Sequence, residues 1–306
     1  MTGPLKATVP EAATGSPFGP AIAAMAFYFK HLQHVGYQRL ERLFADVFGL
    51  RISQGALCNL LRRGGRRFEA VKADILNRLR EAQAVASDET GVRVEGAGAQ
   101  HWVFRSAHVV LHEIAFSRGA IVVRDVMGGH RPVYWTSDRY AAQQGHGERH
   151  QTCLAHLARD AAWVLEAGSE RIGLALKLWF NDVFALARAD LAASTLKRKR
   201  RDLERRIDSI LLQTTDCDET RKVLRKIANA RDQLLTFLDA PDGLVDATNN
   251  ACERALRPAV INRKVTNGFR SLWGARIDAA LRSTVDTGRL TGCNPFDTIN
   301  QTLAAP

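Results

Sequence analysis

The amino-acid sequence predicts a mixed α/β fold, and three changes of hydrophobic spacing along the chain support this class. Apolar residues recur with the 3.6-residue period of amphipathic helices up to about residue 82. From about Val85 to Tyr140 the period falls toward two, and Val, Ile, Phe, Trp and Thr become frequent, as in strands. Helical spacing then returns and continues to about Leu238. A chain of 306 residues, 46% of them hydrophobic, is long enough to form about two domains.

The first part of the chain predicts a small helical domain behind an extended leader. Residues 1–20 hold four prolines among small residues, a composition typical of extended chain. Over residues 21–82 we expect helices. One should end at Gly49, because glycine suits the position after a helix, and the next should begin after Ser53, because serine is a good N-cap.

The helix expected after Ser53 carries a polar and basic face opposite an apolar stripe. Gln54, Arg62 and Arg63 lie on the polar face, and a short turn containing a glycine joins this helix to the one before it. The arrangement resembles a helix-turn-helix, whose second helix binds DNA. A solvated basic face in an ordinary helical bundle is the alternative, and the sequence leaves both open.

Four strands and one helix are expected next. The strand candidates are residues 84–94, 101–109, 111–117 and 132–140, and the helix candidate, residues 118–129, ends in two glycines. Short connections join the first three strands, so we expect an antiparallel meander. We expect its first strand to pair also with the fourth, in parallel, which is an α/β layout.

A basic run lies in the helical region that follows. Between Lys197 and Arg206 the chain has seven basic residues against two acids. Lys197, Arg198 and Arg200 are candidates for contacts with DNA phosphates, and a solvated face or hinge is the structural alternative.

The overall charge indicates a polyanionic partner. The formal net charge is +11, from 43 basic and 32 acidic residues, which favours nucleic acid or an anionic membrane surface. The apolar run of residues 21–29 is too short to span a bilayer and no signal sequence precedes it, so we expect a cytoplasmic protein without a membrane partner. The five cysteines contain no C-x-x-C pair, so the sequence indicates neither a disulfide framework nor a cysteine-rich zinc finger.

Two aspartates stand in the strand candidates, where a buried acid is costly unless it is paired or binds a metal. Asp88 lies in the first strand, in "SDET", and Asp138 at the end of the fourth, in "TSDRY". If these strands are neighbours, the two carboxylates emerge together. A third acid from a later helix, Glu253 in "ATNNACERALRP", would complete an oxygen-rich Mg²⁺ site suited to phosphodiester chemistry with two metal ions.

Glu253 also has a purely structural interpretation. If Asn250 is an N-cap, Glu253 is the third helical residue, from which its side chain can close a capping box. Glu253 and Arg257 also have the i, i+4 spacing of a helical ion pair. The two interpretations make opposite predictions, because a side chain folded onto the cap cannot also bind a metal beside Asp88 and Asp138.

Several motifs in a fixed order resemble one family. They are "SDETGVRV", "SDRY", "HQTCLAHLARD", "NNACERALRP", "NRK" and "LRSTVDTGRLTGCNPFDTI". From about Phe18 to the C-terminus the chain is similar to the catalytic core of the insertion sequence 66 family of bacterial DDE transposases. The resemblance implies an RNase H-like core interrupted by an all-helical insertion, with Asp88, Asp138 and Glu253 as catalytic and metal-binding triad.

The resemblance also implies an activity and its partners. The expected reaction is cleavage at transposon ends followed by transfer of the 3′-hydroxyl into target DNA, with two Mg²⁺ ions, for which Mn²⁺ is a substitute. DNA is the partner, at the nucleoid, with a homo-oligomer on paired ends and accessory proteins of the element. The resemblance and the hydrophobic periodicity together predict five regions. They are a leader (1–20), a helical DNA-binding domain (21–82), the first part of the core (83–158), the helical insertion (159–244) and the second part of the core (245–306).

Residues near the three acids in the sequence each have a functional and a structural interpretation. Glu89 points away from Asp88 if this is a strand, which favours a structural role. The C-x-x-H pair, Cys153 and His156, offers two of the four ligands of a closed zinc site, so we favour support of the active site. Asn249 and Asn250 are expected as helix caps. The basic residues near Glu253 are candidates for phosphate contacts or internal pairing: Arg254, Arg257, Arg263 and Lys264.

Two tryptophans of the expected insertion have competing roles. Trp163 and Trp179 could stack on unpaired bases near a cleaved DNA end. Their apolar surroundings favour ordinary core packing for both.

The functional alternatives remain open at this stage. Longer members of the family carry a cysteine-rich zinc-binding element ahead of the matched part, and this chain has no such cysteines. A truncated, non-catalytic DNA-binding remnant that regulates a full-length relative is therefore one alternative. A structure-specific nuclease of the same fold is the other.

Overall fold

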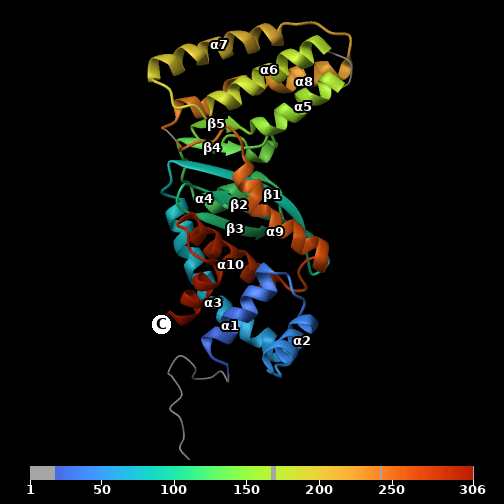
Figure 1. Ribbon diagram of the computed structural model, residues 1–306, viewed down its shortest axis with the longest axis vertical. Helices are drawn as coiled ribbons and strands as arrows, with labels where there is room; N and C mark the ends of the chain where they lie inside the picture. Colours follow the sequence, from blue (N-terminus) through green and yellow to red (C-terminus); the bar gives the residue numbers. More distant parts are fainter. Residues whose placement is uncertain (1–17, 167–169, 242, 306) are drawn as a thin grey trace, which may run out of the picture. The chain divides into compact units, whose positions relative to one another are not determined.

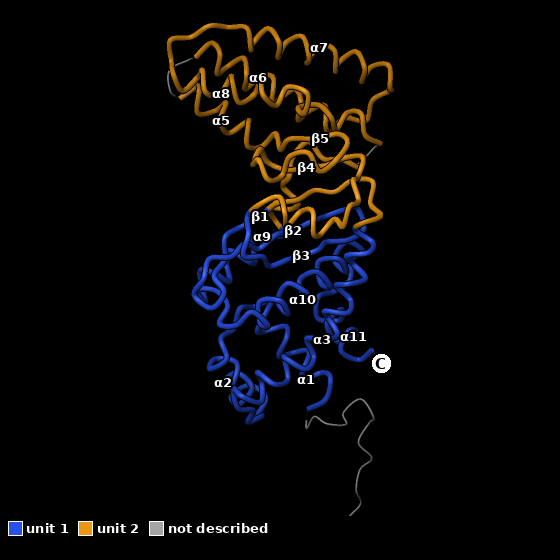
Figure 2. Tube along the Cα trace, turned by 180° about the vertical axis from the view of Figure 1, so that it is seen from behind, with its two compact units in different colours: residues 1–79, 89–118, 255–306 blue, residues 80–88, 119–254 orange. Residues whose placement is uncertain are grey.

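The computed structural model describes residues 18–166, 170–241 and 243–305, and it divides into two compact units. The first unit comprises residues 1–79, 89–118 and 255–306, and the second comprises residues 80–88 and 119–254 (Figure 2). Most of the leader expected over residues 1–20 lies outside the described residues. The α/β class predicted from the sequence is confirmed, with one sheet of five strands and many helices.

The sheet has the strand order β3-β2-β1-β4-β5. Its strands are β1 (Ala84–Val94), β2 (Ala97–Arg105), β3 (Val110–Ala115), β4 (Tyr134–Ser137) and β5 (Arg149–Thr152). β2 pairs with β3 in antiparallel fashion, and β1 pairs with β4 in parallel, as predicted. The short fifth strand was not predicted, because "RHQT" lacks apolar alternation; its buried residues are the polar Gln151 and Thr152.

Helices α1 (Pro20–Phe27), α2 (Tyr37–Phe48), α3 (Gln54–Leu79), α10 (Leu272–Leu290) and α11 (Pro295–Ala304) belong to the first unit. In Figure 1, α10 lies beside α3, and the two helices come so close that a Cβ at Gly65 would lie 2.3 Å from Ile277 Cδ1. Both predicted helix ends are confirmed. Gly49 adopts a left-handed φ of 66° after α2, and the Ser53 hydroxyl accepts a hydrogen bond from the Ala56 N–H at the start of α3 (3.2 Å).

The second unit contains α4 (Ala120–Met127), α5 (Leu154–Glu166), α6 (Glu170–Leu186), α7 (Ala193–Leu211) and α8 (Asp218–Ala228). Helix α9 (Asn250–Thr266) begins in this unit and continues into the first. The indole N–H of Trp179, on α6, donates to the carbonyl of Leu203, on α7, at 2.8 Å. Because Trp179 is fully buried in the apolar core of these helices, its predicted packing role is confirmed.

The core role predicted for Trp163 is wrong. This side chain is 54% exposed. Helix α5 buries Leu157, Ala161 and Val164, and the 3.6-residue period turns position 163 away from that stripe. The apolar neighbourhood in the sequence therefore did not reveal which side of the helix Trp163 occupies.

None of the helices within the described ranges combines the length and the apolar character that a membrane span requires.

Gly173 allows α5 and α6 to approach one another, and its replacement tests this packing. A Cβ at Gly173 would lie 2.6 Å from Leu165 Cα and 2.7 Å from Leu165 N, both backbone atoms that cannot turn aside. We expect Gly173→Ala to lower the free energy of unfolding by about 1–3 kcal/mol. Gly55→Ala in α3 is the matched control, because no heavy atom lies within 4 Å of its added Cβ. Urea unfolding of both variants gives the comparison, and equal stability of the two would contradict the close approach.

Candidate active site

Asp88 lies on β1 and Asp138 directly follows β4, the strand that pairs with β1 in parallel, and both residues belong to the second unit. The register pairs Ala84 with Tyr134 and Ala86 with Thr136. Asp88 and Asp138 each lie two residues beyond the last residues of this pairing, Ala86 and Thr136. In-register residues of adjacent strands point to the same face of a sheet, with their backbones about 4.8 Å apart. The neighbouring strands that the sequence hypothesis required are therefore present.

The turn after β4 holds Asp138 in place. Its Oδ1 accepts a hydrogen bond from the Tyr140 N–H (2.8 Å), and the Gln144 side chain donates to its carbonyl (3.0 Å). The Ser137 hydroxyl donates to the same carbonyl at 2.9 Å. Asp88 and Asp138 are both half-buried. The backbone around Asp138 is thus fixed while its second carboxylate oxygen remains for other contacts.

Asn249 fastens the start of α9 to the ends of two strands. Its side-chain amide donates to the carbonyl of Ser87 on β1 (2.8 Å), and its backbone N–H donates to Cys153 Sγ, directly after β5 (3.1 Å). Asn249 is 1% exposed, and its Oδ1 has no hydrogen-bond partner among the described residues. These bonds place the first turn of α9 next to the residue that precedes Asp88.

The predicted capping box at Asn250 is wrong. The Glu253 N–H donates to the carbonyl of Asn249 (3.2 Å), which makes Asn249 the N-cap and Asn250 the first helical residue. Glu253 is then the fourth helical residue, one position beyond the one that closes a capping box. The error came from choosing the wrong member of the Asn-Asn pair.

Glu253 instead faces α5. Its Oε1 lies 3.7 Å from His156 Nε2 and 3.8 Å from a guanidinium nitrogen of Arg159, whereas no ion pair with Arg257 is found in the described structure. Oε1 is buried and has no hydrogen-bond partner among the described residues. His156 and Arg159 are close enough for ion pairs but too far for hydrogen bonds. A buried carboxylate oxygen without a hydrogen bond is costly, so this atom is a candidate metal ligand.

Cys153 and His156 lie beside Glu253, as the C-x-x-H pattern allows. One ligand atom from each of the three residues lies within 4.8 Å of the others. Burial raises the pKa of the Cys153 thiol, which disfavours the thiolate that a metal would need. The thiol instead accepts the Asn249 N–H, which is the supporting contact that the sequence analysis favoured.

Glu89, the neighbour of Asp88, belongs to the first unit. Its side chain is 2% exposed and pairs with Arg118 at 2.8 Å. This ion pair agrees with the structural role inferred from strand alternation.

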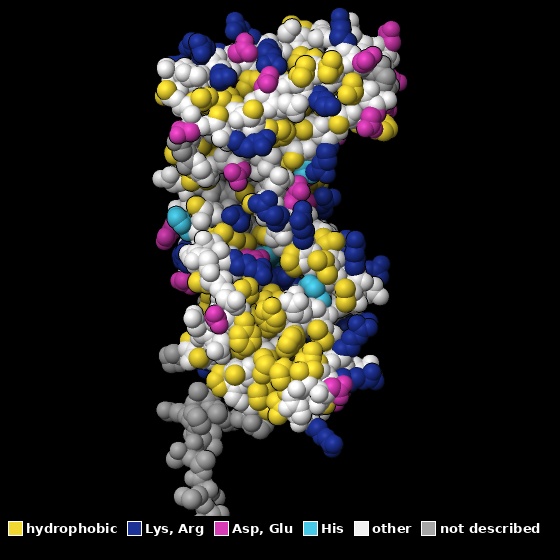
Figure 3. Space-filling model, viewed as in Figure 1, with side chains coloured by type: hydrophobic (Ala, Val, Ile, Leu, Met, Phe, Trp, Pro, Cys, Tyr) yellow, Lys and Arg dark blue, Asp and Glu magenta, His cyan; other side chains and the backbone are white. Residues whose placement is uncertain are grey.

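The basic residues predicted to bind DNA differ in their availability. Arg62 and Arg63 are exposed on α3, where Asn59 and Arg66 line a hollow of about 380 Å³ with them. Gln54 is exposed too, but its amide donates to Glu41 (2.9 Å). Figure 3 shows Lys and Arg side chains mainly in the upper and middle parts of the face and along its right edge, whereas hydrophobic side chains dominate the lower part.

Two of the predicted DNA-binding residues are engaged inside the protein. Arg200 pairs with Glu204 (2.9 Å) and with Asp239, so it ties α7 to the segment before α9. Arg263 donates to the carbonyl of Gly91 at 2.5 Å. The others are exposed: Lys197, Arg198, Arg254, Arg257 and Lys264.

Arg159 is a site residue that the sequence analysis did not single out. It lies on the same face of α5 as His156, three residues further on, within "CLAHLARD". That spacing was the signal available in the sequence, because residues at i and i+3 of a helix share a face.

These features define an α/β protein with a five-stranded sheet, in which a buried asparagine attaches the start of α9 to β1. A model of the family described as "Transposase IS66 family" matches residues 15–277, and the chain belongs to this family. It is also 24% identical over 290 residues to "Uncharacterized protein y4qI" of Sinorhizobium fredii (strain NBRC 101917 / NGR234). The match covers 83% of this chain and 53% of that protein, so the chain spans about half the length of this relative.

His150, on β5, links stability to pH at this site. Its Nε2 lies 3.2 Å from the Ser137 hydroxyl, and burial, with smaller effects of the charges of His146 and Arg139, lowers its pKa from 6.5 to about 4. Between these values the unfolded chain binds the proton more readily than the folded one. Stability is therefore lost as the pH falls from 6.5 toward 4, by up to about 3 kcal/mol.

We expect His150→Asn to reduce this pH dependence. The measurement is urea unfolding of both proteins at pH 7 and pH 4.5. The difference in unfolding free energy between the two pH values should be smaller in the variant, because a neutral amide replaces the titrating ring. An unchanged difference would contradict the burial of a neutral His150.

Proposed function

We propose that this transposase-family chain is a DDE-type DNA transposase with an RNase H-like core, in which Asp88, Asp138 and Glu253 bind the catalytic metal ions. The observation that supports the proposal most is the parallel pairing of β1 with β4, because Asp88 lies on β1 and Asp138 directly follows β4. The helices α5–α8, between Asp138 and Glu253, support the helical insertion that we expect over residues 159–244. Family membership supports the transposase role and DNA as partner.

The three residues fit Mg²⁺. Carboxylate oxygens are the ligands that this hard cation prefers, and the buried Glu253 Oε1 has no hydrogen-bond partner among the described residues. Asp88 and Asp138 would hold the ions jointly and Glu253 would bind from the helix side, with Mn²⁺ as a substitute. Two such ions, when bound, stabilise the attacking and the leaving oxygen of an in-line phosphodiester displacement.

The protein's own residues position the groups that carry this chemistry. Asn249 fixes the start of α9 through Ser87 and Cys153, which sets where Glu253 stands. His156 and Arg159 lie within 4 Å of the Glu253 carboxylate and limit its movement. The attacking group is water in cleavage and the DNA 3′-hydroxyl in strand transfer, so no side-chain nucleophile is required.

The exposed basic residues support binding of transposon ends and target. Arg62 and Arg63 on α3, together with Lys197 and Arg198 on α7, are placed where phosphates can reach them. The exposed Trp163 is available to stack on an unpaired base. We expect the protein to act as a homo-oligomer on paired ends with accessory proteins of the element.

Substitution of the three acids tests the function. We expect Asp88→Asn, Asp138→Asn and Glu253→Gln each to abolish Mg²⁺-dependent strand transfer, by at least about a thousandfold, because each removes a charged metal ligand. Glu148→Gln is the matched control, since Glu148 is an exposed acid of the same unit. The assay joins a pre-cleaved transposon end to a plasmid target. Full activity in any one of the three variants would remove that residue from the triad.

The same assay separates the alternatives. A structure-specific nuclease would nick DNA with Mg²⁺ but would not join the pre-cleaved end to the plasmid. A regulatory remnant would bind DNA in a salt-dependent manner and would neither nick nor join it.

A further inference from the structure

A concave site lies wholly within the first unit. It is a cavity of about 680 Å³ formed by the segment from Lys30 to His34, the starts of α2, α3 and α10, and the end of α9. This volume is within the range of small-molecule and nucleotide sites. Neither Asp88, Asp138 nor Glu253 lines it.

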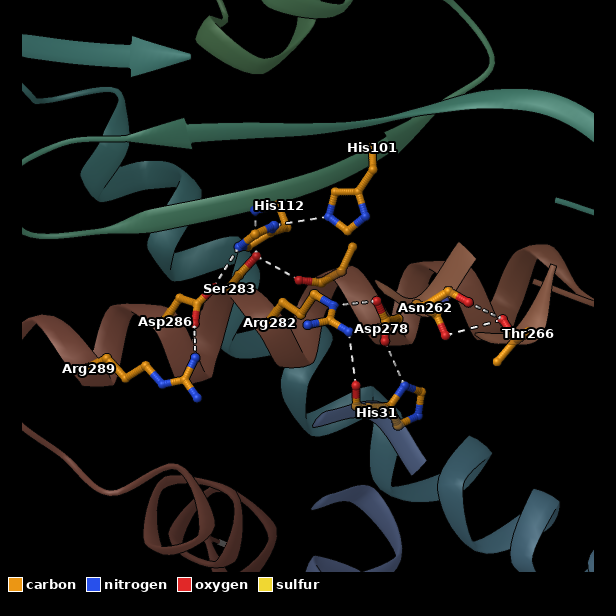
Figure 4. Close-up of polar contacts among 11 residues, drawn as sticks. His31, His101, His112, Asn262, Thr266, Asp278, Arg282, Ser283, Asp286 and Arg289 are labelled. Carbon is orange, nitrogen blue, oxygen red and sulfur yellow. Dashed lines mark hydrogen bonds and ion pairs between the residues drawn. The ribbon is translucent and has the colours of Figure 1, made fainter. Parts of the chain in front are cut away.

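The cavity has a cationic lining. Lys30, Arg39 and Arg270 contribute to its wall, and the one acid among the described lining residues is Asp278. Figure 4 shows that Asp278 is already engaged: its Oδ2 accepts from Arg282 (2.7 Å) and its Oδ1 lies 3.0 Å from His31 Nδ1. The acid is thus neutralised at the base of the cavity, and the remaining charge favours an anion.

The backbone adds to the anion-binding character. The first turn of α2, a helix of 12 residues, lines the cavity through Tyr37 and Arg39, and its N-cap, Gly36, supplies no side chain to accept the N–H groups there. Uncapped N–H groups at a helix start, together with the helix dipole, attract negative charge. By contrast, the Ser271 hydroxyl caps the start of α10 by accepting from Gly274 (3.2 Å).

Buried polar groups of the wall point independently to a ligand. His34 lines the cavity, is 8% exposed, and its Nδ1 has no hydrogen-bond partner among the described residues. The Lys30 ammonium lies 4.9 Å from the centre of the Tyr37 ring, and burial lowers its pKa. An anionic ligand would stabilise the charged form of this amine.

Aromatic side chains complete the site. Tyr37, Phe269 and Trp273 line the same cavity as the cations. Flat aromatic faces beside arginine and lysine are the combination that binds an unstacked nucleobase and its phosphate.

We propose that this cavity binds a single unpaired nucleotide of a DNA strand, with the phosphate at Lys30, Arg39, Arg270 and the first turn of α2, and the base against the aromatic wall. A DNA strand and a free mononucleotide both carry the nucleotide phosphate that this site would bind. The choice of a DNA strand as its source rests on the proposed function, whereas the nucleotide site itself does not.

A binding assay without Mg²⁺ tests the site in the full chain. The probes are a fluorescein-labelled DNA hairpin with one unpaired nucleotide and a fully paired hairpin of equal length, and fluorescence anisotropy gives the affinities. The double variant Arg39→Ala/Arg270→Ala removes two exposed arginines of the wall. Its control is the double variant Arg42→Ala/Arg276→Ala. These two arginines are exposed on α2 and α10, and neither lines the cavity.

We expect the unpaired nucleotide to be bound more tightly than the paired hairpin, and the first double variant to weaken its binding at least about tenfold. The control should change it less than about twofold. Equal weakening by both double variants, or equal affinity for both hairpins, would overturn the proposal. Free deoxyadenosine monophosphate should compete only at much higher concentration; equal affinity for it would overturn the DNA source.

The outcome is separable from that of the strand-transfer assay. Asp88→Asn leaves the cavity intact and should bind the unpaired nucleotide as the unaltered protein does. If the unaltered protein prefers the unpaired nucleotide but does not catalyse strand transfer, only the proposed function is contradicted. Loss of that preference with strand transfer retained would contradict the cavity alone.

Discussion

The parallel pairing of β1 with β4 is the constraint on which the candidate active site depends. Asp88 lies on β1, two residues beyond its last pair with β4, Asp138 directly follows β4, and β5 pairs with β4 in parallel. Asn249 then attaches the start of α9 to the carbonyl of Ser87 and to Cys153 Sγ. Because the chain between Asp138 and Asn249 is long and mostly helical, this one buried asparagine determines where Glu253 stands relative to the strands.

In the first unit, a different set of buried polar contacts holds α10 to the segments around it, as Figure 4 shows. Arg282 is 2% exposed, donates to Asp278 and also donates to the carbonyl of His31 at 2.9 Å. Further along the helix, Asp286 lies 3.0 Å from His112 on β3. Removal of one partner from such a buried pair leaves a charge without compensation. These contacts connect the base of the cationic cavity to the sheet through a single rigid helix.

Much of the architecture could be predicted from the sequence, because apolar periodicity reports which residues are buried. The bounds of β1 and the parallel β1–β4 pair were predicted, as were the helix ends at Gly49 and Ser53. The strand β5 was missed because polar residues fill its buried positions. Tertiary contacts decided the rest: the cap at Asn249 rather than Asn250, the exposure of Trp163, and the engagement of Arg200 and Arg263 inside the protein. The roles of the three acids stay a prediction.

Binding of Mn²⁺ to the full chain, followed by electron paramagnetic resonance, tests the central claim most directly. The account predicts that the unaltered protein binds Mn²⁺ and that Asp88→Asn, Asp138→Asn and Glu253→Gln each weaken this binding at least about tenfold, whereas Cys153→Ala leaves it unchanged. The contradictory result is binding that survives both aspartate substitutions and is lost with Cys153 and His156. That result would assign the metal to the cluster of Cys153, His156 and Glu253 instead of the two strands.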